Sequence, residues 1–181
     1  MHSKSEIIES YKDLWGRVSE TILQCSDEEF KSKSSPDVWS IAEEFEHLTK
    51  ATQVVLEALL YPSLIVKWKF GKPNRPIRTY DECHKRYTDK IAALDGKPKS
   101  PEKFTPKKNE LNKKQMLATW SKQLNLYEKR ISRWSDKSLD NCLLPHPLLG
   151  KMMVREMLFF THFHAEHHAA SISKKATLLL Q

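Results

Sequence analysis

Apolar residues recur at steps of three and four along four long segments of the chain, which is the spacing of amphipathic helices. These segments span residues 5–24, 40–61, 112–134 and 153–174. The third has the most regular pattern, with steps of 3, 4, 3, 4 and 3 through Leu117, Trp120, Leu124, Tyr127, Ile131 and Trp134. The pattern predicts an all-α protein with four long helices.

Helix-start signals support the second of these helices and predict one more. Ser40 and Glu43 are spaced as a capping box, in which a hydroxyl and a carboxylate satisfy free backbone N–H groups at a helix start. Thr79 and Glu82 repeat the motif, and helical spacing follows it until Gly96. The sequence therefore predicts a shorter helix of about four turns after Thr79.

The connection from residue 61 to residue 112 carries six prolines. Because proline lacks a backbone donor and disrupts helix interiors, this region is predicted to be a long crossover between the second and third long helices, with the short helix embedded in it. Residues 143–150 contain two prolines and are predicted to be a short apolar connection without a regular helix. These elements together predict a single four-helix-bundle domain over residues 1–181.

Composition agrees with a helical domain that has no disulfide framework. Of the 181 residues, 39% are hydrophobic, 29% are charged and 4 are glycine. The three cysteines are scattered and no apolar secretory segment follows Met1, so a cytoplasmic location is expected. The longest apolar runs fall far short of the roughly 20 residues of a transmembrane helix, and no membrane association is expected.

The formal net charge of +7 and the pI near 9.2 raise the question of an anionic partner. Much of the excess lies between Lys67 and Lys114, in segments rich in proline and lysine that are predicted to be solvated connections. No nucleic-acid-binding motif accompanies this charge. Nucleic-acid binding is therefore disfavoured, while an interaction with another anionic partner stays open as an alternative.

Five of the eight histidines fall in the last helix or just before it, at positions 146, 162, 164, 167 and 168. At about 100° per residue, His164 and His168 share the inward face, whereas His162 falls on the polar side. Its predicted neighbours on that side are Arg155, Glu166 and Ser173. Two imidazoles at i and i+4 can converge on one metal ion, and His47 in the second helix is the candidate third ligand. An H-x-x-x-H pair also fits a hydrogen-bonded helix feature, so spacing alone leaves both interpretations open.

Two blocks of the sequence resemble motifs of the DinB-like (DinB/YfiT) superfamily. Residues 39–48 read WSIAEEFEHL and resemble its W-S-x-x-E-x-x-x-H-L block. Residues 146–151 (HPLLGK) and 164–172 (HAEHHAASI) resemble its H-P-x-x-G-K and H-x-x-x-H-x-x-Q-I motifs. The chain departs from these patterns at Ser171, where many relatives have Gln, and at Met153, which replaces the usual helix-capping Ser or Thr.

This resemblance implies an up-down-down-up bundle and a divalent metal ion, such as nickel or zinc. In the superfamily one histidine of the second helix and two of the fourth bind the metal, and the matching residues here are His47, His164 and His168. Some relatives are S-transferases or isomerases that use a low-molecular-weight thiol such as bacillithiol or mycothiol. Many others have no established activity.

Three neutral imidazoles leave at least one coordination position open, which is typical of a catalytic site. We therefore expect a metal-dependent enzyme with a small-molecule substrate, either a hydrolase or a thiol-dependent S-transferase. A bundle that binds a small ligand or a thiol without turnover is the alternative. The carboxylates near the histidines are predicted to point mostly outward, so no catalytic residue is assigned among Glu43, Glu44, Glu46 and Glu166.

The remaining aromatic and apolar residues are given structural roles. Two roles are open to the aromatic residues Trp15, Trp39, Trp68, Trp120, Trp134, Tyr11 and Tyr127. They are predicted mainly to fill the core, and lining an apolar pocket beside the metal is the alternative. His146 is predicted to belong to the connection that precedes the last helix. The apolar end at Leu178, Leu179 and Leu180 is expected to pack either on the bundle or on a second subunit, and the second alternative would give a homodimer.

Overall fold

A computed structural model describes residues 3–94, 100–107 and 111–179 of the chain. Gly96, Pro98 and Leu180, on which some predictions above depend, lie outside these residues. The four predicted long helices are α1 (Lys4–Gln24), α3 (Ile41–Leu60), α6 (Lys113–Ser132) and α8 (Val154–Leu179). Three have bounds within two residues of the prediction, and α8 continues five residues farther. The predicted all-α class is confirmed.

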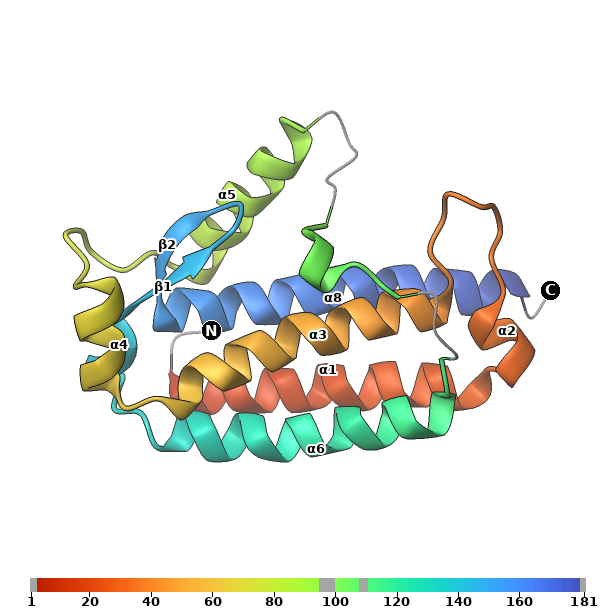
Figure 1. The fold of residues 1–181 in the computed structure, drawn as a ribbon, viewed down its shortest axis with the longest axis horizontal. Helices are drawn as coiled ribbons and strands as arrows, with labels where there is room; N and C mark the ends of the chain where they lie inside the picture. Colours follow the sequence, from red (N-terminus) through yellow and green to blue (C-terminus); the bar gives the residue numbers. More distant parts are fainter. Residues whose placement is uncertain (1–2, 95–99, 108–110, 180–181) are drawn as a thin grey trace.

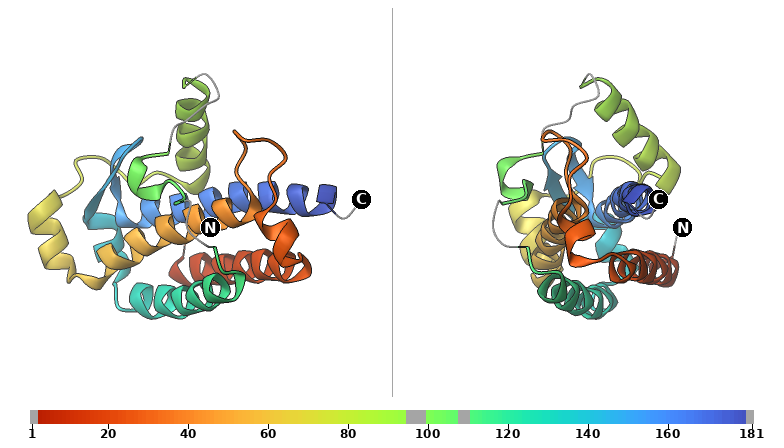
Figure 2. Two further views of the ribbon diagram at one scale, coloured as in Figure 1. Left: turned by 45° about the vertical axis from the view of Figure 1, so that its right-hand side comes forward. Right: turned by 90° about the vertical axis from the view of Figure 1, so that its right-hand side faces the viewer.

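The four long helices form a bundle with up-down-down-up topology (Figure 1). Helices α1 and α8 run in one direction and lie side by side, whereas α3 and α6 are paired and run in the opposite direction. Helix α3 also packs against α8, and α1 against α6, so the four helices enclose one common core. The view along the bundle shows this arrangement end on (Figure 2).

Capping boxes define the helix starts that the sequence predicted. Ser40 Oγ accepts a hydrogen bond from the Glu43 backbone N–H at 3.2 Å, and the Glu43 carboxylate accepts one from Ser40 N–H at 2.9 Å. Thr79 and Glu82 form the same reciprocal pair at the start of α5 (Tyr80–Ala92). Each pair satisfies backbone donors that would otherwise have no partner, which explains why these helices begin where they do.

The crossover between α3 and α6 holds more helical structure than predicted. Besides α5 it contains α4 (Ser63–Phe70) and the 3₁₀ turn η1 (Glu102–Phe104). Helix α4 follows Pro62, which occupies the N-cap position without a side-chain capping bond, so the usual start signal is missing. The crossover lies on the side of the bundle formed by α3 and α8 (Figures 1 and 2). Two further short helices that the sequence did not predict are α2 (Asp27–Lys31) and α7 (Asp136–Asn141).

The apolar connection before α8 is a β-hairpin. Strands β1 (Leu143–His146) and β2 (Gly150–Met153) pair antiparallel, with Leu143 opposite Met153 and His146 opposite Gly150. Gly150 has a φ of +71°, a left-handed conformation that glycine adopts without strain. The two prolines exclude a helix here, as predicted, but a two-stranded ladder tolerates Pro145 on its edge.

A buried carboxylate joins the crossover to the start of α8. Both oxygens of Glu156 accept hydrogen bonds at 2.5 Å from the Arg75 guanidinium, and backbone N–H groups of Arg78 and Met153 add two more at 2.9 and 3.1 Å. Burial on its own raises the pKa of Glu156, but these donors outweigh it and hold the pKa below its ordinary value. Glu156 therefore accepts a hydrogen bond from the Met153 N–H at the start of α8. This carboxylate caps the helix start although Met153 itself has no capping hydroxyl.

Aromatic rings fill the core between α1 and α6. Trp15 stacks on Trp120 with ring centroids 3.7 Å apart, and Tyr11 stacks on Tyr127 at 4.3 Å. Trp15, Trp120 and Trp134 are buried as predicted, but the core role predicted for Trp68 is wrong, because this side chain is 85% exposed on α4. Cys25, Cys83 and Cys142 are buried and unpaired. Within the described part of the chain, no helix has the length and apolarity that a bilayer crossing requires.

Candidate metal centre

Three histidines from two helices converge beside the crossover. His47 lies on α3, and His164 and His168 lie one turn apart on α8, with one nitrogen of each ring within 4.8 Å of the others. Nε2 of His47 is 3.2 Å from Nε2 of His164, close to the roughly 3.4 Å expected between two nitrogens bound to one tetrahedral metal ion. Helices α3 and α8 pack against each other, so the bundle itself brings these residues together.

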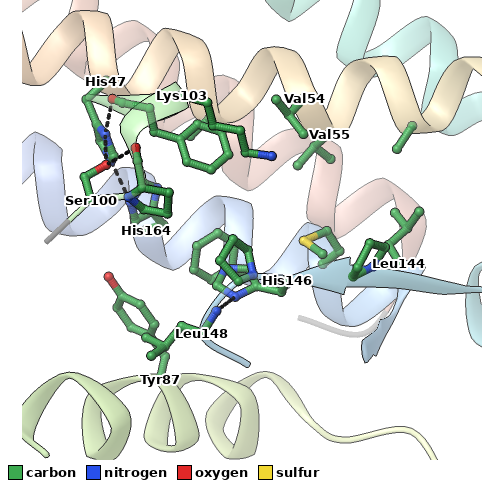
Figure 3. A pocket seen from close by; sticks show the side chains of 18 of the residues that line it. His47, Val54, Val55, Tyr87, Ser100, Lys103, Leu144, His146, Leu148 and His164 are labelled. Atoms are coloured by element: carbon green, nitrogen blue, oxygen red, sulfur yellow. Dashed lines mark hydrogen bonds between the residues drawn. The ribbon is translucent and has the colours of Figure 1, made fainter. Parts of the chain in front are cut away.

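The orientation of His47 is set by the crossover. Its Nδ1–H donates to the Phe104 carbonyl at 2.9 Å, and Ser100 Oγ lies 3.4 Å from the same nitrogen. A proton on Nδ1 leaves Nε2 unprotonated, and this atom faces His164, whose Nε2 is at hydrogen-bond distance (Figure 3). A ligating histidine characteristically donates its second nitrogen to a carbonyl or carboxylate in this way.

A buried carboxylate holds His168. Nδ1 of His168 lies 3.4 Å from Oε2 of Glu44, whose Oε1 accepts hydrogen bonds from Ser171 Oγ at 2.7 Å and from the Lys175 ammonium. Burial alone raises the pKa of Glu44, but the hydrogen bonds from His168, Lys175 and Ser171 outweigh it and keep the pKa below its ordinary value. The side chain is therefore a carboxylate at neutral pH and orients the His168 ring.

The prediction that Glu44 points outward is wrong, since Glu44 is only 6% exposed. Glu44 lies three residues before His47, and residues at i and i+3 share a helix face. That face of α3 packs against α8, which brings Glu44 to His168, Ser171 and Lys175. The spacing between Glu44 and His47 was the available signal. Glu43, in contrast, fills its predicted capping role.

Burial controls the charge of His47 and His164. Burial, with a smaller contribution from the neighbouring His168, lowers the pKa of His47 to about 4. Burial likewise places the pKa of His164 well below its ordinary value, with added contributions from His168 and His47. These two rings are therefore neutral at pH 7, the state in which an imidazole nitrogen binds a metal ion.

The cluster opens into a large cleft of about 1130 Å³ between the bundle, the crossover and the β-hairpin. His47, Ser100 and His164 lie at one end, and Leu144 of the hairpin lies toward the other (Figure 3). The walls are mainly apolar and include residues from α3, α4, α5 and α8. The crossover is thus not only a solvated connection, because it forms one wall of this cleft.

His146 belongs to the cleft as well as to the connection in which it was predicted. Its Nδ1 accepts hydrogen bonds from the Leu148 and Leu149 backbone N–H groups at 3.1 and 3.0 Å, so the ring carries its proton on Nε2. The ring lies against Phe160, with centroids 4.2 Å apart. The helical spacing of residues in the sequence could not predict that His146 lines the cleft, because a β-hairpin and not a helix positions this residue.

His162 lies outside the cluster, and its predicted polar surroundings are only partly correct. The His162 ring is buried and its Nδ1 lies 2.9 Å from the Tyr80 hydroxyl, because α5 covers this side of α8. Arg155 is also buried and bonds Asp136 and Asp140. Glu166 and Ser173 are exposed, as predicted.

Comparisons with known proteins agree with this architecture. A comparison with curated protein sequences gave no match. Among solved structures, YfiT from Bacillus subtilis, described as a probable metal-dependent hydrolase with an unusual four-helix bundle topology, superposes with a TM-score of 0.58. The match covers 97% of this chain and 87% of YfiT at 14% sequence identity, so it indicates a shared fold. The family model of the DinB superfamily matches residues 10–172, and the chain therefore belongs to the DinB superfamily.

Proposed function

We propose that His47, His164 and His168 hold one divalent metal ion, nickel or zinc, and that the chain is a cytoplasmic metal-dependent enzyme with a small-molecule substrate. The observation that carries the proposal is the position of His47 Nε2, which is unprotonated and lies 3.2 Å from His164 Nε2. The reaction class is hydrolysis or thiol-dependent S-transfer. The description of YfiT as a probable metal-dependent hydrolase supports the first class.

The donor set fits these metals. All three donors are imidazole nitrogens, which suit zinc and nickel and leave coordination positions for substrate. A metal ion held in this way would act as a Lewis acid and lower the pKa of a bound water or thiol. The chain's own contribution is to hold His47 through the Phe104 carbonyl and His168 through Glu44, and to keep the site at the end of an apolar cleft.

A thiol for S-transfer would come from solution. No described cysteine lines the cleft, and all three cysteines are buried. Burial raises the pKa of the Cys83 thiol to about 12, which makes it a poor nucleophile. A low-molecular-weight thiol cofactor is therefore part of the transferase form of this proposal.

Metal analysis of the purified protein tests the ligand assignment. We expect one divalent metal ion per chain, and its loss in His47→Ala and in His168→Ala. His84→Ala is the matched control, because His84 is an exposed histidine on α5 outside the cluster. Full metal occupancy in either ligand variant would contradict the assignment.

Activity assays then separate the enzyme from a non-catalytic binder. The metal-loaded protein is screened against activated esters and amides, and against electrophiles in the presence of low-molecular-weight thiols. Turnover that disappears in His47→Ala supports the enzyme, whereas metal and ligand binding without turnover supports the binding bundle.

We also propose that residues 1–181 form one domain, because the crossover and the bundle share one hydrophobic cluster. A homodimer through the exposed Leu178 and Leu179 stays a prediction for light scattering.

A further inference from the structure

We infer that the cleft beside the three histidines accepts an extended apolar molecule that carries an anionic group, and that it discriminates against organic cations. This inference names the substrate class of the proposed enzyme and rests on the proposed function for the identity of the site. It depends on the lining of the cleft and on the charges around it.

The first observation is the gathering of exposed apolar side chains at the cleft. Of twelve large hydrophobic residues that are exposed in the described chain, five line it: Val54, Tyr61, Ile65, Trp68 and Leu94. Trp68 is 85% exposed, although its indole offers one of the largest apolar surfaces of any side chain. Exposed apolar residues that cluster around a concave site indicate that an apolar ligand covers them.

The second observation is the sign of the charges. No Asp or Glu is among the described residues that line the cleft, although the chain has 23 acidic residues. Lys69 and Lys103 line it, and neither forms an ion pair with a carboxylate in the described part of the chain. Apolar walls with uncompensated ammonium groups favour an organic anion over an organic cation.

The third observation concerns the position of Lys103. Lys103 precedes Phe104, whose carbonyl holds His47, and its ammonium lies 4.6 Å from the centroid of the Phe104 ring. The Lys103 side chain points away from His47, toward Val54 and Val55 on the apolar wall (Figure 3). If Lys103 binds the anionic group, the apolar part of the molecule would lie against the apolar side chains of α3 and the hairpin.

Calorimetric titration of the metal-free protein tests the inference with two probes of equal chain length. Octanesulfonate is the anion, because a sulfonate is a poor metal ligand, and octyltrimethylammonium is the cation. Both are used below the concentration at which they form micelles, and methanesulfonate reports what the anionic group does without the chain. We expect octanesulfonate to bind at least about tenfold more tightly than either of the other two.

Two pairs of variants locate the binding. Trp68→Ala should weaken octanesulfonate binding several-fold, whereas Leu23→Ala, which removes another exposed apolar side chain on α1 outside the cleft, should not. Lys103→Glu should weaken it about fivefold and improve cation binding. Lys122→Glu, on the exposed face of α6, changes the net charge equally and should leave both affinities unchanged.

Each outcome decides the question. The inference is overturned if the cation binds as tightly as the anion, if neither octyl probe binds because a second copy of the chain covers the cleft, or if the control variants weaken binding as much as the cleft variants. Because the protein is metal-free, a failed metal analysis with intact octanesulfonate binding would reject the proposed function alone. Stoichiometric metal without octanesulfonate binding would reject this inference alone.

Discussion

The two sides of the bundle use their buried residues in different ways. Between α1 and α6 the core consists of stacked aromatic rings, and among the described residues Trp15 Nε1, Trp120 Nε1 and the Tyr127 hydroxyl have no hydrogen-bond partner. Between α3 and α8 the buried polar groups are linked instead, from Glu44 to His168 and from His47 to the crossover. The first side is built for packing and the second for holding polar atoms in fixed positions, so stability and metal binding should respond to separate substitutions.

The largest expected effect comes from a substitution on the aromatic side of the bundle, between α1 and α6. Trp120→Ala should lower the free energy of unfolding by about 4 kcal/mol, because it removes a fully buried ring that contacts Trp15 and Phe45. Urea denaturation in the presence of a chelator measures this change.

Trp120→Phe is the matched control for that prediction. It keeps an aromatic ring and removes an N–H group without a described partner, so it should cost less than about 1.5 kcal/mol. Saturating metal should still raise the melting temperature of both variants, since neither change touches a histidine of the cluster. A loss of the metal-dependent shift in Trp120→Phe would show that the two sides are coupled.

The next effect tests the link between crossover and bundle. Glu156→Gln should lower the free energy of unfolding by about 2 kcal/mol at neutral pH, because a neutral amide replaces a carboxylate held by Arg75 and two backbone N–H groups. Since the pKa of Glu156 is depressed in the folded protein, its contribution is present above the ordinary value of 4.5 and is lost as the pH falls through the folded pKa.

The difference between Glu156→Gln and the unmodified protein should therefore be greatest above pH 5 and should narrow below pH 4.5. Urea denaturation over this pH range gives the measurement. Glu20→Gln, which neutralises an exposed carboxylate on α1, is the matched control for the loss of one negative charge. A difference that stays constant down to acid pH would contradict the assigned ionisation of Glu156.

The long helices could be predicted because each carries its own information. The apolar spacing of residues 112–134 and the Ser40–Glu43 capping box are local signals, and α6 and α3 begin at the predicted positions. Helix α4 and the hairpin could not be predicted in this way. Pro62 provides no capping side chain, and the strands are stable only because each pairs with the other and packs on neighbouring helices.

The candidate site was predictable only in part, for a similar reason. The i, i+4 spacing of His164 and His168 is local. His47 was the candidate third ligand from its place in the second helix, and the resemblance to a known family supported that choice. The residues that orient them depend on tertiary contacts. Phe104 holds His47 through its backbone carbonyl, so the identity of its side chain gives no sequence signal for this role. Glu44 reaches His168 only because α3 packs on α8.

A smaller effect, on metal affinity, is expected from a substitution between α3 and α8. Glu44→Gln should lower metal affinity about 10- to 100-fold with one binding site retained, because the amide holds the His168 ring less firmly than the carboxylate does. Competition with a chromophoric chelator measures the affinity. Glu57→Gln, an exposed position on the same helix, should bind metal as the unmodified protein does. Unchanged affinity in Glu44→Gln would mean that Glu44 serves only the ion pair with Lys175.

The smallest expected effect concerns Ser171, where many relatives have Gln. Its hydroxyl donates to Glu44 Oε1, but the Lys175 ammonium contacts the same oxygen, so Ser171→Ala should reduce metal affinity only about threefold. If Ser171 acts through Glu44, the effects of the two substitutions will not add, and Ser171→Ala will change nothing further in the Glu44→Gln protein. Additive losses in this double-mutant cycle would place Ser171 in a separate role at the site. Non-additive losses would support a chain of contacts from Ser171 through Glu44 to His168, the kind of linked polar arrangement that the aromatic side of the bundle lacks among its described residues.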